Sequence, residues 1–283
     1  MAFNMNRTWS QATGLMRSNF QLLAIIAGIF MLIPGVVIYM AMPDVFSRMA
    51  LADDPEQISA IMASVAGPLT LFFLISFVLQ MIGYGAMVAL MGEERPTVGE
   101  ALVRGTKSLL TLIGTGLIVL VVYVLLSFVL GLVLVLLAGL IGAVGGQAAA
   151  AVLSFVALLA IFLIVLYVMT RLSLTLAVVV LERQLNPISA LLRSWRLTKP
   201  HAWNIFGFYV LLVIAYIVIS VLVLGVLGVV GTAFGEGAGS MFFMGLVNGV
   251  LGALVAMVLS GILVSMHQQL SERSSASIGE TFG

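Results

Sequence analysis

Long stretches without a charged residue dominate the chain. Five runs contain no Asp, Glu, Lys or Arg: residues 18–43, 57–92, 108–170, 200–235 and 237–271. About 20 apolar residues in a helix cross the roughly 30 Å hydrocarbon core of a membrane, so every run is long enough to do so. The third run is long enough to cross twice, and the glycines of GAVGGQ at Gly142 to Gln147 permit the turn between the two crossings.

The pattern therefore predicts six membrane spans. Their expected bounds are 20–42, 67–91, 109–141, 148–180, 203–233 and 240–267. Nearly every position in these segments is apolar, whereas the strands of a membrane barrel would alternate apolar and polar residues. The predicted fold class is all-α, a polytopic membrane helical bundle.

Composition agrees with a membrane location and excludes several kinds of reactive or metal-binding site. Hydrophobic residues make up 62% of the chain, charged residues 8%, and the mean hydropathy is +1.25, which leaves too little polar surface for a soluble globule. The absence of cysteine excludes disulfides, thiolate metal ligands and cysteine nucleophiles. A mixed polar segment precedes the first span, which is longer than a signal-peptide core, so we expect this span to be retained.

Interfacial arginines and acid-base pairs recur with a period of about 88 residues. The arginines are Arg17, Arg104 and Arg193, in GLMRS, ALVRG and ALLRS, and the pairs are Glu94-Arg95, Glu182-Arg183 and Glu272-Arg273. The helix-capping residues Ser10, Thr97 and Asn186 each stand shortly before one of these arginines. We expect one membrane domain of three tandem units, 8–93, 94–182 and 183–273, each an interfacial helix followed by a helical hairpin.

Positive charge lies almost entirely on one side of the predicted topology. Of the 12 Lys and Arg residues, only Arg48 falls on the side opposite the termini. Cytoplasmic loops carry such an excess of cations, which predicts cytoplasmic termini and cytoplasmic interfacial helices. The loop after the first span is acidic, and DDPEQISAIM at 53–62 predicts a short capped helix outside the membrane.

The third interfacial segment, ALLRSWRLTKP, is amphipathic. Apolar residues including Leu191 and Trp195 form one helical stripe, and Arg193, Arg196 and Lys199 form another, as in helices that lie in the headgroup plane. Two interpretations stay open. The cations orient the hairpin, or they bind a specific phospholipid or phosphorylated ligand with the help of Trp195.

Polar residues within the spans are few. No Asp or Glu lies in a predicted span, which disfavours ion-coupled carriers and membrane hydrolases. Arg171 either extends to the interface, the interpretation we favour, or lies deeper and needs partners such as Tyr167, backbone carbonyls or a lipid phosphate. The amides of Gln80 and Asn248 join helices or line a pathway.

Glycine stripes occur on the last two spans. Gly245, Gly249 and Gly252 share one face of the sixth span, and Gly228, Gly231 and Gly235 share one face of the fifth. Small residues permit close helix approach, so we expect tight packing within the third hairpin. Dimerisation stays open.

The segment PISALLRSWRLTK at Pro187 to Lys199, with RLSLTLAVVVLE at Arg171 to Glu182, carries a family resemblance. It resembles the six-span YciC-like bacterial inner-membrane proteins and the membrane domain fused to some glycerophosphodiester phosphodiesterases. The resemblance implies an integral protein of the bacterial inner membrane. It does not imply phosphodiesterase activity, which belongs to a separate soluble barrel, and it implies no functional residues for this chain.

We therefore expect a non-catalytic plasma-membrane protein that engages anionic lipid of the cytoplasmic leaflet, or a membrane partner, through its basic interfacial helices. The alternative is a transporter or channel-like protein for a lipid or a small phosphorylated solute, which a cavity reaching Arg171 or Asn248 would favour. No phosphate-binding loop, dinucleotide fingerprint, metal-ligand cluster or nucleic-acid-binding pattern is present, so no cofactor, metal or nucleic acid is expected. Candidate lipid contacts are Arg171, Arg193, Trp195, Arg196 and Lys199.

The predicted topology can be tested by cysteine labelling, because the chain has no cysteine of its own. In Arg104→Cys and Arg193→Cys, an impermeant maleimide should react only from the cytoplasmic side. In Asp53→Cys it should react only from the opposite side. Labelling of position 104 or 193 from the outer face of intact cells would contradict the topology.

Overall fold

The computed structural model describes residues 3–41, 45, 48–49, 51–94, 96–233, 235 and 238–282, with no side-chain description for 144, 145, 232, 238 and 273–282. Helix accounts for 91% of the structure, and the described residues form no strand. Six helical stretches are long and apolar enough to cross a membrane: Phe20–Ala41, Pro55–Leu90, Val98–Ala143, Gly146–Leu181, Pro187–Gly231 and Gly239–Glu272. The prediction of six spans is confirmed. Arg95 and the side chain of Arg273, from two of the predicted acid-base pairs, lie outside the described residues.

The first hairpin follows helix α1 (Met5–Ser18). Its first arm is α2 (Phe20–Ala27), a π-helical turn (Gly28–Leu32) and α3 (Ile33–Ala41), and its second arm is α5 (Pro55–Leu90). Asp54 caps α5 by accepting a hydrogen bond from the backbone of Glu56 at 3.0 Å. The prediction of a separate outer helix at 53–62 is wrong in one respect. The helix does begin there, but it continues through Gly67 and Pro68 directly into the span.

The second hairpin is α6 (Val98–Leu172), which reverses at Gly146, where the backbone has a φ of 81°. This confirms the predicted turn, since only glycine adopts that conformation at little cost. A capping box starts α6: the Thr97 amide donates to Glu100 Oε2 at 2.9 Å, and the Glu100 amide donates to Thr97 Oγ1 at 3.4 Å. The second interfacial helix is not separate, because no proline interrupts it before the span.

The third hairpin is preceded by a short helix, α7 (Thr175–Leu181). Helix α8 (Pro187–Thr198) is capped by Asn186, which accepts from two backbone amides at 3.0 and 3.2 Å. A 3-10 turn containing Pro200 (Lys199–His201) separates α8 from α9 (Ala202–Thr232), and α10 (Ala238–Phe282) returns. The caps predicted at Thr97 and Asn186 are confirmed.

The cap predicted at Ser10 is wrong. Helix α1 starts earlier, with Asn4 accepting from the Arg7 amide at 3.0 Å. Ser10 lies within the helix, and its hydroxyl donates to the carbonyl oxygen of Arg7 at 3.1 Å. An asparagine is as good a cap as a serine, and the helix gains a turn by using it.

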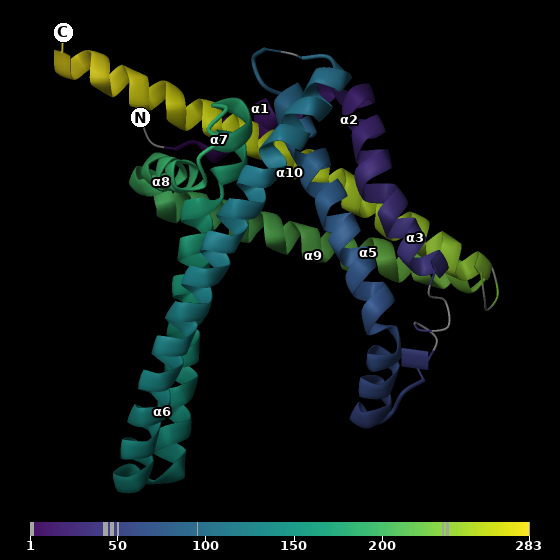
Figure 1. The fold of residues 1–283 in the computed structure, drawn as a ribbon, viewed down its shortest axis with the longest axis vertical. Coiled ribbons are helices and arrows are strands. Elements are labelled where there is room, and N and C mark those ends of the chain that lie inside the picture. Colours follow the sequence, from purple (N-terminus) through teal and green to yellow (C-terminus); the bar gives the residue numbers. More distant parts are fainter. Residues whose placement is uncertain are drawn as a thin grey trace.

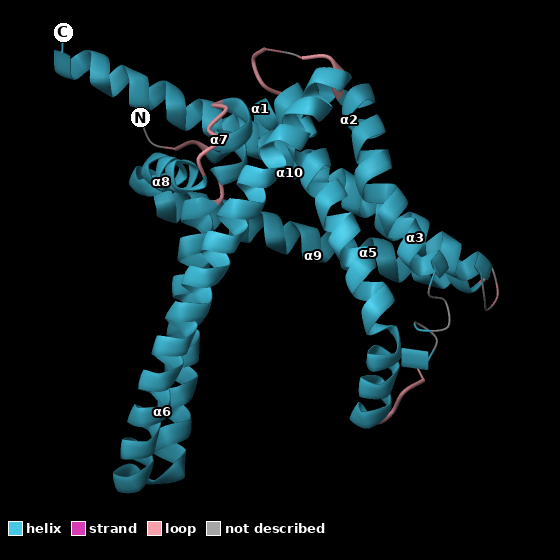
Figure 2. Cartoon of the chain, in the orientation of Figure 1, coloured by secondary structure: helices cyan, strands magenta, loops and turns pink. Residues whose placement is uncertain are grey.

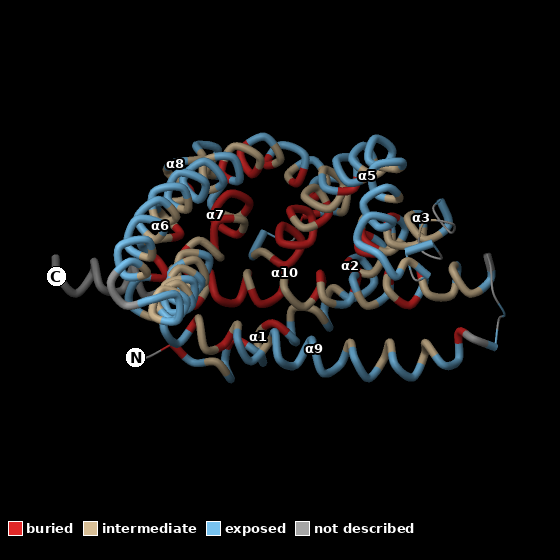
Figure 3. Tube along the Cα trace, turned by 90° about the horizontal axis from the view of Figure 1, so that it is seen from below, coloured by how far each residue is buried: buried red, intermediate tan, exposed pale blue. Residues whose placement is uncertain are grey.

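The three hairpins meet at one end; the α6 hairpin and the start of α5 point away from the rest at the other end, whereas α3 stays packed on α10 (Figures 1 and 2). We call the meeting point, which contains α1, α7 and α8, the closed end. The buried residues gather there (Figure 3): in α5 they run from Gly83 to Leu90, and in α7 most positions are buried. The most apolar windows of both arms of α6 and of the Pro187–Gly231 stretch are 0% buried. The core is therefore at the closed end, and the distal arms present apolar side chains outward.

Each interfacial segment packs on the second arm of a different hairpin: α1 on α10, the start of α6 on α5, and α8 on the second arm of α6. A Cβ on Gly105 of α6 would lie 2.5 Å from the carbonyl oxygen of Ile82 in α5, and one on Gly261 of α10 would lie 3.2 Å from that of Ala12 in α1. In the third contact the Ser194 hydroxyl of α8 donates to the carbonyl oxygen of Arg171 at 3.0 Å. Small side chains bring these backbones close together.

The glycine stripe of α10 faces the first span. A Cβ on Gly249 would lie 2.8 Å from the carbonyl oxygen of Leu32, and Gly245 faces Val36 and Tyr39. In α9, Cβ atoms on Gly228 and Gly231 would meet side chains of α10, Met244 and Phe243, at 3.5 Å or more, which is ordinary contact. The α9 glycines therefore face the predicted partner, but the closest approach of the α10 glycines is to the first span and not within the third hairpin. A glycine stripe on one helix indicates that another helix packs closely against it, but it does not identify that helix.

We expect Gly105→Ala to destabilise the protein by about 1–3 kcal/mol, because the added methyl group meets backbone atoms that cannot rotate away. The matched control is Gly131→Ala in the same helix, where a Cβ meets nothing within 4 Å. Equilibrium unfolding in mixed micelles measures both. Equal stability of the two variants would contradict the close contact between α5 and α6.

Candidate functional site

A first charged cluster at the closed end is centred on Glu94. Its Oε2 accepts hydrogen bonds from Arg104 at 2.5 Å and from Arg183 at 2.6 Å. The hydrogen bond from Arg104, assisted by the charge of Arg183, lowers the pKa of the Glu94 carboxyl. Both ion pairs therefore persist at neutral pH and are lost only as the pH falls through that lowered pKa. One carboxylate is shared between two guanidinium groups.

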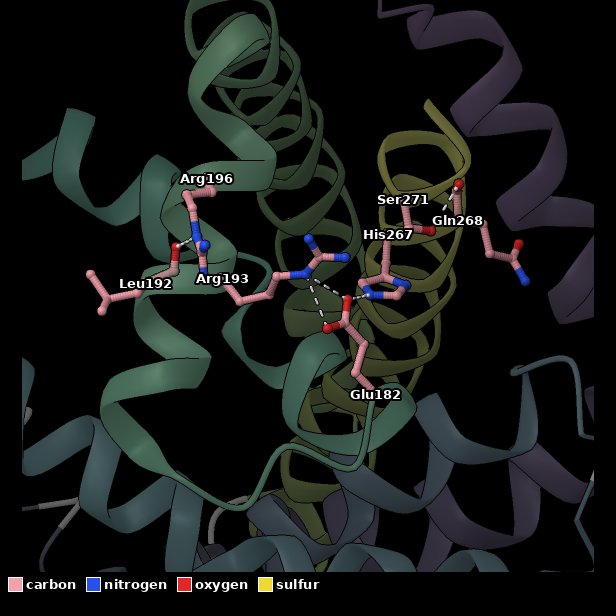
Figure 4. A network of polar contacts seen from close by, with 7 residues as sticks. All are labelled: Glu182, Leu192, Arg193, Arg196, His267, Gln268 and Ser271. Carbon is pink, nitrogen blue, oxygen red and sulfur yellow. Dashed lines mark hydrogen bonds and ion pairs between the residues drawn. The ribbon is translucent and has the colours of Figure 1, made fainter. Parts of the chain in front are cut away.

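A second charged cluster is centred on Glu182 (Figure 4). Arg193 Nε lies 3.1 Å from both carboxylate oxygens, and His267 Nε2 lies 2.9 Å from Oε1. The side chains of Glu182 and Arg193 are about one-third exposed or less, and His267 is 9% exposed. Glu182 thus joins α7, α8 and α10 at a single point.

The two clusters share one arrangement. In each, the glutamate of an acid-base pair binds the interfacial arginine that follows it in sequence, Arg104 after Glu94 and Arg193 after Glu182. The third glutamate, Glu272, lies 3.7 Å from Arg7, and the described residues show no ion pair to Arg17. Sequence reasoning singled out these glutamates and arginines but did not pair them. Their nearly equal spacing, 10 and 11 residues, was the available signal.

A groove of about 660 Å³ lies beside the Glu94 cluster, and we call it the basic groove. Its cations are Arg104, Lys107 and Arg183. Its one carboxylate, Glu100, is already bound to the backbone amide of Thr97. Lys107 is exposed and makes no ion pair with any described residue. The groove therefore presents an excess of hydrogen-bond donors and positive charge, which suits an anion.

An apolar cavity of about 540 Å³ follows the basic groove along the same two helices. Its lining includes Phe77, Leu112, Thr115, Gly116, Leu172, Leu176, Leu191 and Leu263. On α6 the lining passes from Ser108 in the groove to Leu112 in the cavity, and on α7 from Val180 to Leu176. Residues four apart lie on the same face of a helix, about one turn from each other. The basic groove and the apolar cavity therefore lie about one helical turn apart along α6 and α7.

A further cavity of about 320 Å³, which we call the polar cavity, lies between α3, α5, α9 and α10. It brings together Gln80 and Asn248, the two amides that the sequence placed at depth on different spans. Ser76, Tyr84 and Tyr216 also line it. The two amides thus share a cavity instead of joining a single pair of helices.

Arg171 is buried, with 1% of its surface exposed. Its guanidinium carbon lies 4.3 Å from the centre of the Trp195 ring and 5.9 Å from that of Tyr167. Its carbonyl oxygen accepts from the hydroxyls of Ser194 and Thr198, each at 3.0 Å. The favoured interpretation, in which Arg171 extends to the interface, is wrong, because α8 covers the side chain. Tyr167 is a partner, as the other interpretation expected, and the cation–π contacts hold α8 on α6.

The predicted lipid contacts fall in separate places. Trp195 stacks on Arg171, and Arg193 binds Glu182, while Arg196 on α8 and Lys199 in the turn after it are exposed. None of these five residues lines the basic groove, although Arg104, one of the repeat arginines, does. Lys107 and Arg183 were missed as site residues. Lys107 lies one helical turn after Arg104, which was the signal available for it.

The comparison with protein families gives one match. A family model described as "Domain of unknown function (DUF7847)" matches residues 6–271, which include the whole of the basic groove, the apolar cavity and the polar cavity. Neither the curated proteins nor the solved structures contain a match.

We expect Glu182→Gln to lower the stability by about 1–2 kcal/mol, since Arg193 and His267 both lose their charged partner in a half-buried site. The control is Glu93→Gln, at an exposed position without an ion pair among the described residues, which should change the stability by less than about 0.5 kcal/mol. Equilibrium unfolding in mixed micelles compares the two. If the Glu182 variant were as stable as the control, Glu182 would not join the three helices.

Proposed function

We propose that this chain, which belongs to the family described as Domain of unknown function (DUF7847), binds an anionic phospholipid in the membrane and catalyses no reaction. One observation carries the proposal: the basic groove and the apolar cavity are lined by neighbouring turns of α6 and α7. A phospholipid has the same order of parts, a charged phosphate joined to acyl chains. The phosphate would lie at Arg104, Lys107 and Arg183, and a chain in the apolar cavity.

The headgroup, not the chain, supplies the selectivity in this proposal. An acyl chain that leaves the bilayer for an apolar cavity exchanges one hydrocarbon environment for another and gains little free energy. Each cation near an anionic headgroup contributes about 1 kcal/mol. Lys107 has no competing carboxylate among the described residues, whereas Arg104 and Arg183 share Glu94 and keep further N–H donors for a phosphate.

We further propose that the chain is built from three tandem units, 8–93, 94–182 and 183–273, with the closed end in the cytoplasmic leaflet of a bacterial inner membrane. The matching ion pairs of Glu94 and Glu182 support the repeat, as does the packing of each interfacial segment on the second arm of a different hairpin. The positive charge of the connections supports the orientation. The resemblance to the YciC-like proteins supports the membrane.

A second candidate is a passive transporter for a lipid or a small phosphorylated solute. The polar cavity favours it, because it reaches Asn248 within the spans. Reconstituted protein should then move a fluorescent phospholipid or a phosphorylated sugar across liposomes. Transfer no faster than in protein-free liposomes would contradict this candidate, and it would not contradict the lipid-binding proposal.

Native mass spectrometry with phosphatidylglycerol tests the lipid proposal. Lys107→Gln and Arg183→Gln should each weaken retention of the lipid by about fivefold, the factor that corresponds to 1 kcal/mol. The matched controls are Arg196→Gln and Lys199→Gln, which remove equal charge from exposed positions in α8 and in the turn after it. Equal losses of lipid retention in all four variants would show that retention depends on overall charge, and would contradict specific binding in the groove.

The apolar cavity has its own test. Gly116 lines the cavity, and a Cβ there meets nothing within 4 Å, so Gly116→Leu should fill the space without displacing neighbours. This variant should retain less of every two-chain phospholipid, whatever the headgroup, in the same mass spectrometric assay. Gly131→Leu, on the part of α6 outside the cavity, is the control. Unchanged retention in the Gly116 variant would show that the cavity holds no acyl chain.

A further inference from the structure

We propose that the polar cavity is a binding site for an uncharged, hydroxyl-bearing molecule of the glycerol class. No residue lines both this site and the basic groove, although the site adjoins the apolar cavity at Tyr84, which lines the two. The inference therefore goes beyond phospholipid binding and does not require transport.

The polar groups of the cavity converge from four helices, one of them α3, which contributes Tyr39. Ser76, Gln80 and Tyr84 lie at four-residue steps on one face of α5, Tyr216 comes from α9 and Asn248 from α10. Every residue that lines the cavity is uncharged. An ion inside the membrane needs a counter-charge or many dipoles, so the lining favours a neutral ligand over a phosphate or a carboxylate.

The hydrogen-bonding groups of the cavity are left with spare capacity. The Asn248 amide nitrogen donates to the carbonyl oxygen of Met244 at 3.0 Å, which leaves its own side-chain oxygen as an acceptor. Gln80 and Ser76 make no side-chain hydrogen bond within the described part of the chain, although Ser76 is only 5% exposed. Polar groups without partners are costly at this depth. A ligand hydroxyl, which both donates and accepts, can satisfy an amide and a serine at the same time.

The rest of the lining sets the size and the entrance. A volume of about 320 Å³ is at the small end of ligand pockets. Phe73 and Tyr216 line the cavity and are 59% and 49% exposed, on helices whose outward faces are apolar, so the cavity opens sideways towards lipid. The same hydroxyl chemistry has two sources: dissolved glycerol, or the glycerol hydroxyl of diacylglycerol in the bilayer.

Protection of a single cysteine tests the proposal, since the chain has none of its own. Ser76→Cys places a nearly isosteric thiol in the cavity, and Ser127→Cys places one on α6, outside it. Both proteins are reconstituted in liposomes and their reaction rates with N-ethylmaleimide are measured. The rates are compared with and without diacylglycerol in the bilayer, and with and without glycerol in the buffer.

A ligand present at about ten times its Kd should slow the reaction of the Ser76 variant about tenfold and leave the Ser127 variant unchanged. Protection by diacylglycerol identifies a lipid source, and protection by glycerol a dissolved one. Protection by neither overturns the proposal. Equal protection by phosphatidic acid, which carries a charged phosphate on the same hydroxyl, also overturns it, because the site would then not select a neutral group.

Two additional substitutions in the Ser76→Cys protein complete the design. Gln80→Leu keeps the size of the side chain but removes its hydrogen bonds, and it should abolish the protection while the unfolding midpoint stays unchanged. Lys107→Gln, which weakens the basic groove, should leave the protection intact. Loss of protection with Lys107→Gln would show that a single site is being measured and would overturn the assignment of a separate one.

Discussion

Hydrocarbon offers no hydrogen-bond partner, so each backbone N–H and C=O within the membrane must be satisfied inside its own helix. This constraint produces the six spans, and it also explains why they separate. Apolar side chains gain nothing by leaving lipid for one another, so an arm of α6 can remain uncovered. Helices associate where something other than hydrophobicity joins them. In this protein those places include the ion pairs of Glu94 and Glu182, the Arg171 contacts with Trp195, and the close backbone approaches at Gly105 and Gly249.

The features predicted correctly from the sequence depend on short segments. A run of apolar residues, an Asn before a Pro, or a cluster of glycines acts locally, which is why the spans, the Asn186 cap and the turn at Gly146 were found. The errors concern partners that are distant in sequence. Gly249 packs on the first span and not on the fifth, and the burial of Arg171 depends on the position of α8 over α6. Ser10 is a different error, because a competing cap, Asn4, stood nearby.

For the candidate site too, local features were predictable from the sequence and contacts between distant residues were not. Its basic character could be predicted, because the few cations of the chain lie beside the predicted spans. Which of these cations line the site could not be predicted. The structure places the exposed cations of α8 and the turn after it apart from the groove, which instead uses Lys107 of α6 and Arg183 of the connection after α7. Arg183 adopts a left-handed backbone with a φ of 54°, rare for a residue with a side chain. This conformation depends on the ends of α7 and α8, which no local pattern encodes.

The length of α6 adds a mechanical consequence. The uncharged part of its first arm, residues 108–143, measures about 54 Å at 1.5 Å per residue, well above the thickness of the hydrocarbon core. A helix relieves such hydrophobic mismatch by tilting, and its tilt angle changes with the thickness of the surrounding bilayer. Arg104 and Lys107 lie near the start of this arm, so a change in its tilt angle moves one wall of the basic groove relative to α7. We therefore expect the thickness of the bilayer to influence the shape of the basic groove.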